Sequence, residues 1–303
     1  MNTKNKGEVQ YHELQLNLFN FNDWQGQITL PPSPLKKETI GKNSVLQLAF
    51  RGMCVDASAS KSDEEGYYLV KTEKAFPFNE LLLRLKGTRR SESNHLVFTA
   101  PELKSISELG PDTRLEWENL DLLARDFSQP EQVLENWKGK FVFREEDDKV
   151  GTKGMRPPQV GALHAISAHF AVGECFEPAT VVLPTGTGKT ETMLSFQVYK
   201  RLRRTLVIVP SDALRTQISR KFLTLGVLPD VDVIPPETIG PNVVRLKTGL
   251  RSEEEARDII KKSNVIVTLP QTLMASTPEA IKVLTESCTD LIVDEAHHIP
   301  ASQ

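Results

Sequence analysis

The residues with the clearest chemical potential form a short glycine-rich turn directly after an apolar run, Val181–Leu183. Two glycines would let the backbone wind tightly, so that several N–H groups point at a polyphosphate, and a following helix would add the positive end of its dipole. The ammonium of Lys189 suits β- and γ-phosphates, and the hydroxyl of Thr190 suits Mg²⁺. The pattern predicts a nucleoside triphosphate loop whose contacts are Thr185, Gly186, Thr187, Gly188, Lys189 and Thr190.

The loop departs from the full phosphate-loop pattern at one position. Leu183 stands where GxxxxGK[ST] begins with glycine. A Gly/Thr-rich turn with a chance Lys-Thr pair is therefore the alternative. The expected strand before the turn and the expected helix over 191–201 favour the phosphate loop.

A second apolar run, Leu291–Val293, leads into the acidic sequence Asp294-Glu295-Ala296-His297. A carboxylate at the carboxyl end of a buried strand is where nucleotide-bound Mg²⁺ lies in an open α/β sheet. We expect Asp294 to hold the metal together with Thr190, and Glu295 to orient and deprotonate a water. Lys189, Asp294 and Glu295 are the expected catalytic residues. An acidic cap on the following helix is the alternative.

Composition and charge limit the class of protein. The chain has 303 residues, enough for two domains, with 39% hydrophobic residues and a net charge of −3. This balance argues against a uniformly basic nucleic-acid binder but allows a local basic track. The sequence has no run long enough for a membrane span and starts without the apolar core of a signal peptide. Three isolated cysteines are expected to be reduced and buried, so we expect a cytoplasmic protein with no membrane partner.

The first part of the chain, residues 1–145, predicts a mixed α/β accessory domain. Short apolar runs predict strands, leucine spacing predicts helices, and Pro- or Ser/Asp/Glu-rich stretches predict loops. The expected strands are 45–50, 67–70 and 95–98, the expected helices are 79–86, 101–109 and 130–137, and the expected loops are 31–42 and 56–66.

The second part, residues 150–303, alternates short β-branched runs with helical stretches. Such alternation is typical of crossover units, and it predicts an α/β fold with a parallel sheet and helices on both faces. A further strand is possible within 231–244. The expected strands are 181–183, 205–209, 264–268 and 290–293, and the expected helices are 191–201, 212–225, 253–262 and 278–286.

With both nucleotide motifs placed, residues 155–303 resemble the first RecA-like lobe of superfamily 2 helicases of the DEAD/DEAH type. The segment Met155–Gln159, MRPPQ, resembles the family segment upstream of the phosphate loop. In the family its glutamine reads the adenine ring. The resemblance therefore implies nucleotide contacts by Arg156 and Gln159, although a plain loop before a helix is the alternative.

The resemblance extends to the motifs that contact the nucleic-acid backbone. Val209-Pro210-Ser211 resembles one such strand end, although Ser211 can also cap the next helix. VTLPQTL, residues 267–273, resembles the next motif, with Leu269 in place of the usual threonine. The implied nucleic-acid contacts are Pro210, Ser211, Thr268 and Gln271, and the implied link between ATP site and nucleic acid is His297.

The combination RPPQ, PTGTGKT and DEAHH is most similar to the ATPase subunits of type I and type III restriction enzymes and related phage-defence helicases. This favours DNA over RNA, with a nuclease or other defence subunit as a further partner. An RNA helicase and a truncated, non-catalytic ATP-binding or docking module are the alternatives. The family's second lobe does not follow Gln303, so we expect a fragment of a longer chain that binds ATP-Mg²⁺ weakly and turns it over poorly.

Two basic stretches could contact phosphates. One is Lys200–Arg204, whose cations also suit a helix carboxyl end. The other comprises Arg84, Lys86, Arg89 and Arg90 in the accessory domain. For both stretches a solvated structural role is the alternative.

Overall fold

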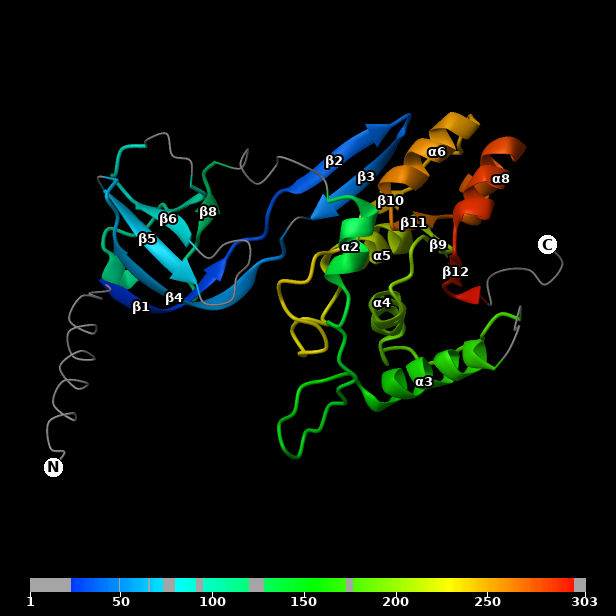
Figure 1. Ribbon diagram of the computed structural model, residues 1–303, viewed down its shortest axis with the longest axis horizontal. Helices are drawn as coiled ribbons and strands as arrows, with labels where there is room; N and C mark the ends of the chain where they lie inside the picture. The colour runs from blue at the N-terminus through cyan, green and yellow to red at the C-terminus, as the bar shows by residue number, and fades with distance from the viewer. Residues whose placement is uncertain are drawn as a thin grey trace, which may run out of the picture. The chain divides into compact units, whose positions relative to one another are not determined.

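The computed structural model describes residues 23–48, 50–64, 66–72, 80–90, 95–119, 128–172 and 177–296 (Figure 1). The chain forms two compact units. Unit 1 consists of Met1–Pro32 and Gly52–Arg125, and unit 2 consists of Ser33–Arg51 and Asp126–Gln303. This grouping differs from the predicted domain boundary at residues 145–150. An early hairpin and a helix that were expected in the accessory domain are grouped with the nucleotide-binding part instead.

Unit 1 is built on a six-stranded sheet in the order β1-β4-β5-β6-β7-β8. Neighbouring strands are antiparallel except for the parallel pair β6 and β7. The unit also contains a short 3-10 helix, η1 (Ile106–Glu108). The strands are β1 (Trp24–Leu30), β4 (Met53–Lys61), β5 (Tyr67–Thr72), β6 (Glu80–Leu85), β7 (Val97–Ala100) and β8 (Glu116–Trp117).

Three local predictions in unit 1 were wrong. The expected loop 56–66 is largely strand β4, because its small and polar residues alternate with side chains that face the sheet core. The expected helix 79–86 is strand β6. A short run of leucines fits the periodicity of a helix as well as that of a strand, and here the leucines are buried on both faces of the strand. The expected helix 101–109 shrinks to the turn η1.

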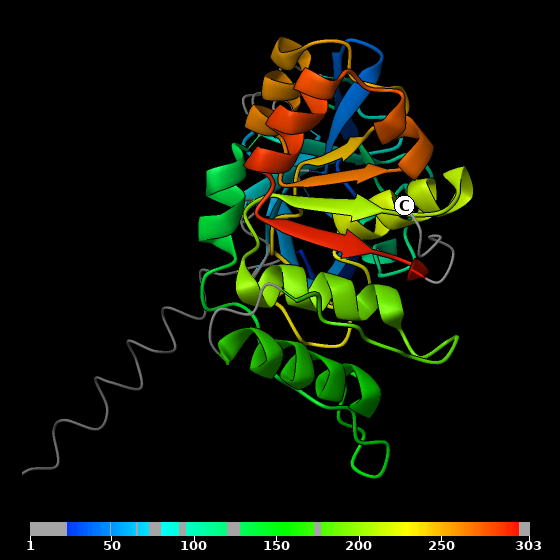
Figure 2. The ribbon, with the colours of Figure 1, turned by 90° about the vertical axis from the view of Figure 1, so that its right-hand side faces the viewer.

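Unit 2 contains a second six-stranded sheet in the order β12-β9-β11-β10-β3-β2 (Figure 2). The first four strands are parallel, whereas β3 and β2 are antiparallel to their neighbours. The strands are β2 (Leu35–Ile40), β3 (Asn43–Leu48), β9 (Thr205–Ile208), β10 (Val243–Arg245), β11 (Val265–Thr268) and β12 (Asp290–Val293).

Helices cover both faces of this sheet, which confirms the α/β fold class. On one face, Leu194 of α4 and Phe222 of α5 pack in a buried cluster with Val207 and Val267. The other face buries α6 and α8 over Leu206, Val244 and Ile266. The helices are α2 (Pro130–Asn136), α3 (Pro157–Ala171), α4 (Lys189–Lys200), α5 (Asp212–Thr224), α6 (Glu253–Lys262), α7 (Pro270–Met274) and α8 (Pro278–Ser287).

The hairpin β2–β3 replaces a predicted loop. Residues 31–42 contain a proline cluster that is typical of a linker, but the segment after Pro34 pairs with β3, and β3 pairs with β10. Buried amides fasten the hairpin. Gln47 donates to the side chain of Asn242, and its own side-chain oxygen accepts the Ser128 N–H at 3.0 Å.

The strand expected at Val181–Leu183 is not part of either sheet in the described residues. Val182 is 87% exposed, and β12 forms the edge of the sheet with Leu291 61% exposed. An apolar run signals a tendency to be buried, but a strand also needs a neighbour to complete its hydrogen-bond ladder. The segment therefore runs here as an irregular connection into the glycine-rich turn.

Candidate nucleotide-binding site

The glycine-rich turn adopts a backbone shape that favours glycine at two positions. Gly186 has φ +83° and Gly188 has φ +92°, both in the left-handed region. Gly188 is the N-cap of α4, and without a side chain it leaves the first N–H groups of the helix open to an outside acceptor. Thr187 closes the turn by donating from its hydroxyl to the Pro184 carbonyl at 2.6 Å.

The start of α3 holds this turn through its two glycine carbonyls. Nη1 of Arg156 donates to the Gly186 carbonyl at 2.6 Å, and Nε2 of Gln159 donates to the Gly188 carbonyl at 3.3 Å. Gln159 is buried, and its side-chain oxygen also accepts the Arg156 N–H at 2.8 Å. Both residues therefore shape the loop itself, whereas their direct contact with a nucleotide stays a prediction.

The two acidic residues at the end of β12 lie beside the same loop. The Asp294 N–H donates to the Ile208 carbonyl at 2.9 Å, so β12 is tied to β9 at its last position. Glu295 follows in the left-handed region with φ +50°, an uncommon conformation for a residue with a side chain. Its Oε1 lies 3.1 Å from Nζ of Lys189, 106 residues away in sequence.

The electrostatics of this corner favour an additional cation. Burial, followed by the adjacent charge of Glu295, raises the pKa of the Asp294 carboxyl, and a backbone hydrogen bond and Lys189 oppose that rise. Two neighbouring carboxylates thus share one ammonium. A divalent cation would stabilise their ionised forms.

The residues present therefore fit ATP and Mg²⁺. The turn offers N–H groups and a lysine to phosphates, and Asp294 and Thr190 offer oxygen atoms to the metal. The described ranges contain no group of three or more Asp, Glu, His or Cys side chains around one point. Mg²⁺ is usually held by one or two carboxylates with water and substrate phosphates, and Asp294 offers one such carboxylate.

Comparison with known proteins agrees with this geometry. Residues 152–303 match the model of a family described as type III restriction enzyme, res subunit. The chain belongs to this family. The family has a RecA-like fold, is ATP-dependent and helicase-like, and typically uses ATP and Mg²⁺. No match was found among curated proteins.

Within this res-subunit lobe, the catalytic and metal-binding roles of Lys189, Asp294 and Glu295 stay predictions, and their positions suit those roles. Bound Mg²⁺ would neutralise phosphate charge during phosphoryl transfer. Lys189 would exchange its carboxylate partner for phosphate oxygens. Glu295 would then be released to accept a proton from a water, and Asp294 would hold the metal side of the site.

The strand ends also bring the expected nucleic-acid contacts to one edge of the sheet. Val293, Ile208 and Thr268 align in one row across β12, β9 and β11. The Ser211 hydroxyl caps α5 by accepting the Leu214 N–H at 3.3 Å, while Gln271 is exposed on α7. Pro210 lies two residues after Ile208 of this row.

Thr268 is fully buried, and its carbonyl accepts the Val209 N–H at 3.0 Å. Its hydroxyl is therefore not open to a phosphate in this arrangement. The contact roles of Pro210, Ser211, Thr268 and Gln271 stay predictions. His297 lies outside the described residues, so its coupling role also stays a prediction.

The two basic stretches have structural partners. Arg84 and Arg90 both pair with Glu118, at 2.7 and 3.0 Å. In the other stretch, Arg204 donates to the Ile260 carbonyl at 3.0 Å, and Arg203 lies 3.8 Å from Glu131. These contacts favour a structural role for each stretch.

The sequence did not predict one ion pair beside the phosphate loop, between α4 and α5. Nζ of Lys221 on α5 lies 2.6 Å from Oε1 of Glu191 on α4. No local signal could have found it, because the pair depends on how two helices pack. The expectation of buried cysteines was wrong for Cys54, which is exposed.

The described helices are too short or too polar for a lipid bilayer. None of them combines the length and the apolar character that a crossing requires.

Proposed function

We propose that this chain is the nucleotide-binding part of an ATP-dependent DNA translocase or helicase that acts in restriction or phage defence. The observation that carries the proposal is the meeting of Lys189 and Glu295, 3.1 Å apart, at the carboxyl ends of the parallel strands of the sheet. That contact joins the phosphate loop to the acidic turn, the two parts that nucleoside triphosphate hydrolysis requires.

The proposal includes a second RecA-like lobe in the same longer chain. In two-lobed motors of this kind the site lies between lobes, and an arginine supplied from across a site is worth about 10³–10⁵ in rate. The present chain alone should therefore bind ATP-Mg²⁺ weakly and hydrolyse it slowly. A nuclease or other defence subunit is a further proposed partner, and the cytoplasm is the proposed compartment.

DNA is the proposed track because the motif combination RPPQ, PTGTGKT and DEAHH resembles restriction and defence ATPases, and the family match is to a restriction subunit. An RNA track is the alternative outcome of the same experiment.

The test is nucleotide binding and ATP hydrolysis by the chain, and by the longer protein where one exists, with Lys189→Ala beside wild type. Wild type should bind a fluorescent ATP analogue in the presence of Mg²⁺, and Lys189→Ala should bind it at least about tenfold more weakly, the loss of one charge-assisted hydrogen bond. Stimulation of hydrolysis by duplex DNA, single-stranded DNA and RNA would identify the track. Equal nucleotide binding by both proteins would refute the proposal.

A further inference from the structure

Three arginines come together where α5 covers the end of β10. Arg215 and Arg220 belong to α5, and Arg245 is the last residue of β10. Val243 packs in the cluster that includes α5, whereas Val244 packs in the opposite cluster with α6 and α8. Because side chains alternate along a strand, Arg245 lies on the same face as Val243 and faces α5.

The positive charge of this cluster is not balanced by the described residues around it. Arg215 is 6% exposed, donates from Nη1 to the Leu246 carbonyl at 2.8 Å, and pairs with Asp212. Within the described part of the chain, the Arg220 guanidinium forms no ion pair. Burial, then the charges of Arg220 and Arg215, lower the pKa of Arg245, and Asp212 opposes them. Three guanidinium groups therefore share one carboxylate.

The cluster also lacks hydrogen-bond acceptors. The Nε atoms of Arg215 and Arg245 are both buried, and neither has a partner among the described residues. A buried N–H without an acceptor is unfavourable, and more so on a charged group. An anion with several oxygen atoms would supply both the missing charge and the missing acceptors.

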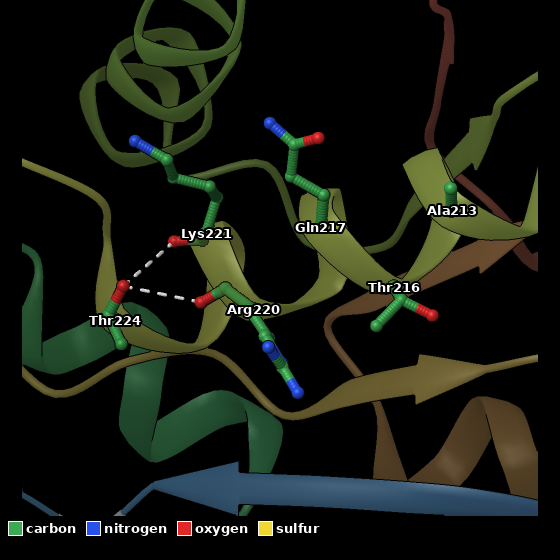
Figure 3. A pocket seen from close by; sticks show the side chains of 6 residues that line it. All are labelled: Ala213, Thr216, Gln217, Arg220, Lys221 and Thr224. Carbon is green, nitrogen blue, oxygen red and sulfur yellow. Dashed lines mark hydrogen bonds between the residues drawn. The ribbon is translucent and has the colours of Figure 1, made fainter.

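The site is open along one side of α5. A groove of about 420 Å³ follows the helix, and its lining residues include Thr216, Arg220 and Thr224 (Figure 3). Figure 3 shows Arg220 and Thr216 extending to one side of the helix, whereas Gln217 and Lys221 extend to the other. Lys221 is held by Glu191, so within the described part of the chain Arg220 is the basic side chain of the groove that is not paired with a carboxylate.

Neighbouring strands continue this polar surface. Ser44 of β3 lies opposite Arg245, and Thr39 of β2 lies opposite Ser44. Lys37 lies two residues before Thr39, so it is on the same face, and both residues are exposed on the edge strand. A basic and hydroxyl-bearing track therefore runs from α5 across β10 and β3 to the edge of the sheet.

The track also lies near the functional edge. Arg245 of β10 lies opposite Val267 of β11. Val267 immediately precedes Thr268, which lies opposite Ile208 in the row of strand ends. The cluster is therefore at the carboxyl ends of the same parallel strands that lead into Ser211 and Asp294.

We propose that Arg215, Arg220 and Arg245 form a site for consecutive phosphate groups of a nucleic-acid strand. This inference rests on the proposed motor function and adds residues that the sequence motifs did not include. Guanidinium groups match phosphate oxygens in geometry as well as charge. The open groove and the exposed Lys37 favour an extended polyanion, because successive phosphate groups can follow the whole track.

The test compares Arg220→Gln with wild type in the binding of a fluorescent single-stranded oligonucleotide and a fluorescent duplex at several NaCl concentrations. Arg220 is exposed, so its replacement should leave the fold intact. We expect about tenfold weaker binding, the usual effect of removing one charge-assisted hydrogen bond. The slope of log affinity against log salt should become shallower by about 0.7 for single strands or about 0.9 for duplex DNA, the value for one phosphate that is no longer neutralised.

The matched control is Arg257→Gln. Arg257 is also an exposed helical arginine, but it lies on α6, on the other face of the sheet, and pairs with Glu253 at 3.1 Å. It should leave the affinity and the salt slope unchanged. Arg245→Gln provides a second variant and should weaken binding in the same direction as Arg220→Gln.

Thermal unfolding separates binding from folding. Since Arg220 repels Arg245, Arg220→Gln should unfold at the same temperature as wild type or higher, although it binds more weakly.

If wild type binds nucleic acid and Arg220→Gln binds it equally well, this inference fails and the motor proposal stands. If wild type binds neither oligonucleotide with or without an ATP analogue, both fail. Binding of poly-glutamate in preference to nucleic acid, lost in Arg220→Gln, would assign the site to an acidic protein partner and overturn it.

Discussion

The ammonium of Lys189 lies 3.1 Å from the carboxylate of Glu295, and this contact occupies the lysine that should bind phosphate. A triphosphate must therefore displace Glu295 from Lys189. Both side chains are partly exposed, so the ion pair should contribute at most about 1 kcal/mol. Phosphate charge can readily compete with it. Nucleotide binding and the release of Glu295 are thus expected to be one event.

Replacing Glu295 tests this exchange. Glu295→Gln removes the competing charge and the expected base, so the variant should bind ATP-Mg²⁺ as tightly as wild type or up to about fivefold more tightly. Its ATP hydrolysis should fall by about 10²–10⁴. Titration with a fluorescent ATP analogue and a phosphate-release assay would measure the two effects. Weaker binding by Glu295→Gln would contradict a competing role.

Asp294 should make stability depend on pH. Its pKa in the folded chain is raised, chiefly by burial, so between the unfolded and folded pKa values the folded protein holds more protons than the unfolded protein. The contribution of Asp294 to stability therefore decreases as the pH rises through that window. Asp294→Asn should be at least as stable as wild type at neutral pH without Mg²⁺, and its advantage should disappear near pH 4, close to the unfolded pKa.

Urea unfolding at several pH values would measure this effect, with the exposed residue Asp258 on α6 as the control position. Asp258→Asn should show no comparable change. Mg²⁺ with ATP should stabilise wild type but not Asp294→Asn. A loss of stability at neutral pH in metal-free Asp294→Asn would contradict the prediction.

The two glycines of the phosphate loop should differ in their tolerance of a side chain. A Cβ on Gly188 would overlap Nε2 of Gln159, whereas a Cβ on Gly186 would meet nothing within 4 Å. Both positions have positive φ, so each alanine costs about 1–2 kcal/mol in backbone strain. Gly188→Ala must also displace Gln159. It should therefore lower stability and nucleotide affinity more than Gly186→Ala, as measured by urea unfolding and analogue titration.

The buried amide of Asn242 should be important for stability. Asn242 is 1% exposed, donates to the Ser128 carbonyl at 2.7 Å, and accepts from Gln47. Asn242→Ala would remove both bonds and leave the Gln47 amide and the Ser128 carbonyl with only their mutual hydrogen bond of 3.3 Å, at a cost of about 1–3 kcal/mol in the free energy of unfolding. Gln217→Ala, which truncates an exposed amide on α5, should change stability by less than about 0.5 kcal/mol. Equal effects in urea unfolding would contradict the role of the network.

Cys288 and Cys54 should differ in reactivity. Burial raises the pKa of the Cys288 thiol to about 11, so this thiol stays protonated at neutral pH. Cys54 is exposed on β4. Iodoacetamide should therefore label Cys54 faster than Cys288 in the native chain, with the rates read by peptide mass spectrometry, and the difference should vanish in urea. Faster labelling of native Cys288 would show that its surroundings open in solution.

Local signals predicted much of unit 2. The helix expected at 253–262 is α6, capped by Ser252, whose hydroxyl accepts the Glu255 N–H at 3.2 Å. The strand expected at 290–293 is β12, and the further strand considered within 231–244 begins at Val243 as β10. The signals for these elements lie within or next to their own residues: a capping side chain, acidic residues in the first turn and basic residues in the last turn of a helix, or a β-branched run in a strand.

The errors came from segments whose structure depends on a partner. Leucines 81, 82, 83 and 85 fit a helix or a buried strand, and their neighbours in the sheet decided for β6. Residues 35–40 have the composition of a linker, but pairing with β3 makes them a strand. Val181–Leu183 has the composition of a strand but no ladder partner in the described sheets.

The sequence by itself determined which reactive groups stand at the ends of elements: Gly186 and Gly188 make a tight turn, and the predicted roles are phosphate binding for Lys189 and metal and water binding for Asp294 and Glu295. These depend on residue type and on a few neighbours. Tertiary structure alone decided that β2 and β3 extend the nucleotide-binding sheet, that Arg156 and Gln159 hold the loop carbonyls, and that Arg215, Arg220 and Arg245 meet. The physical reason is that strand pairing uses backbone groups that nearly every residue has, so sheet order and the side chains it brings together emerge only when the whole chain packs.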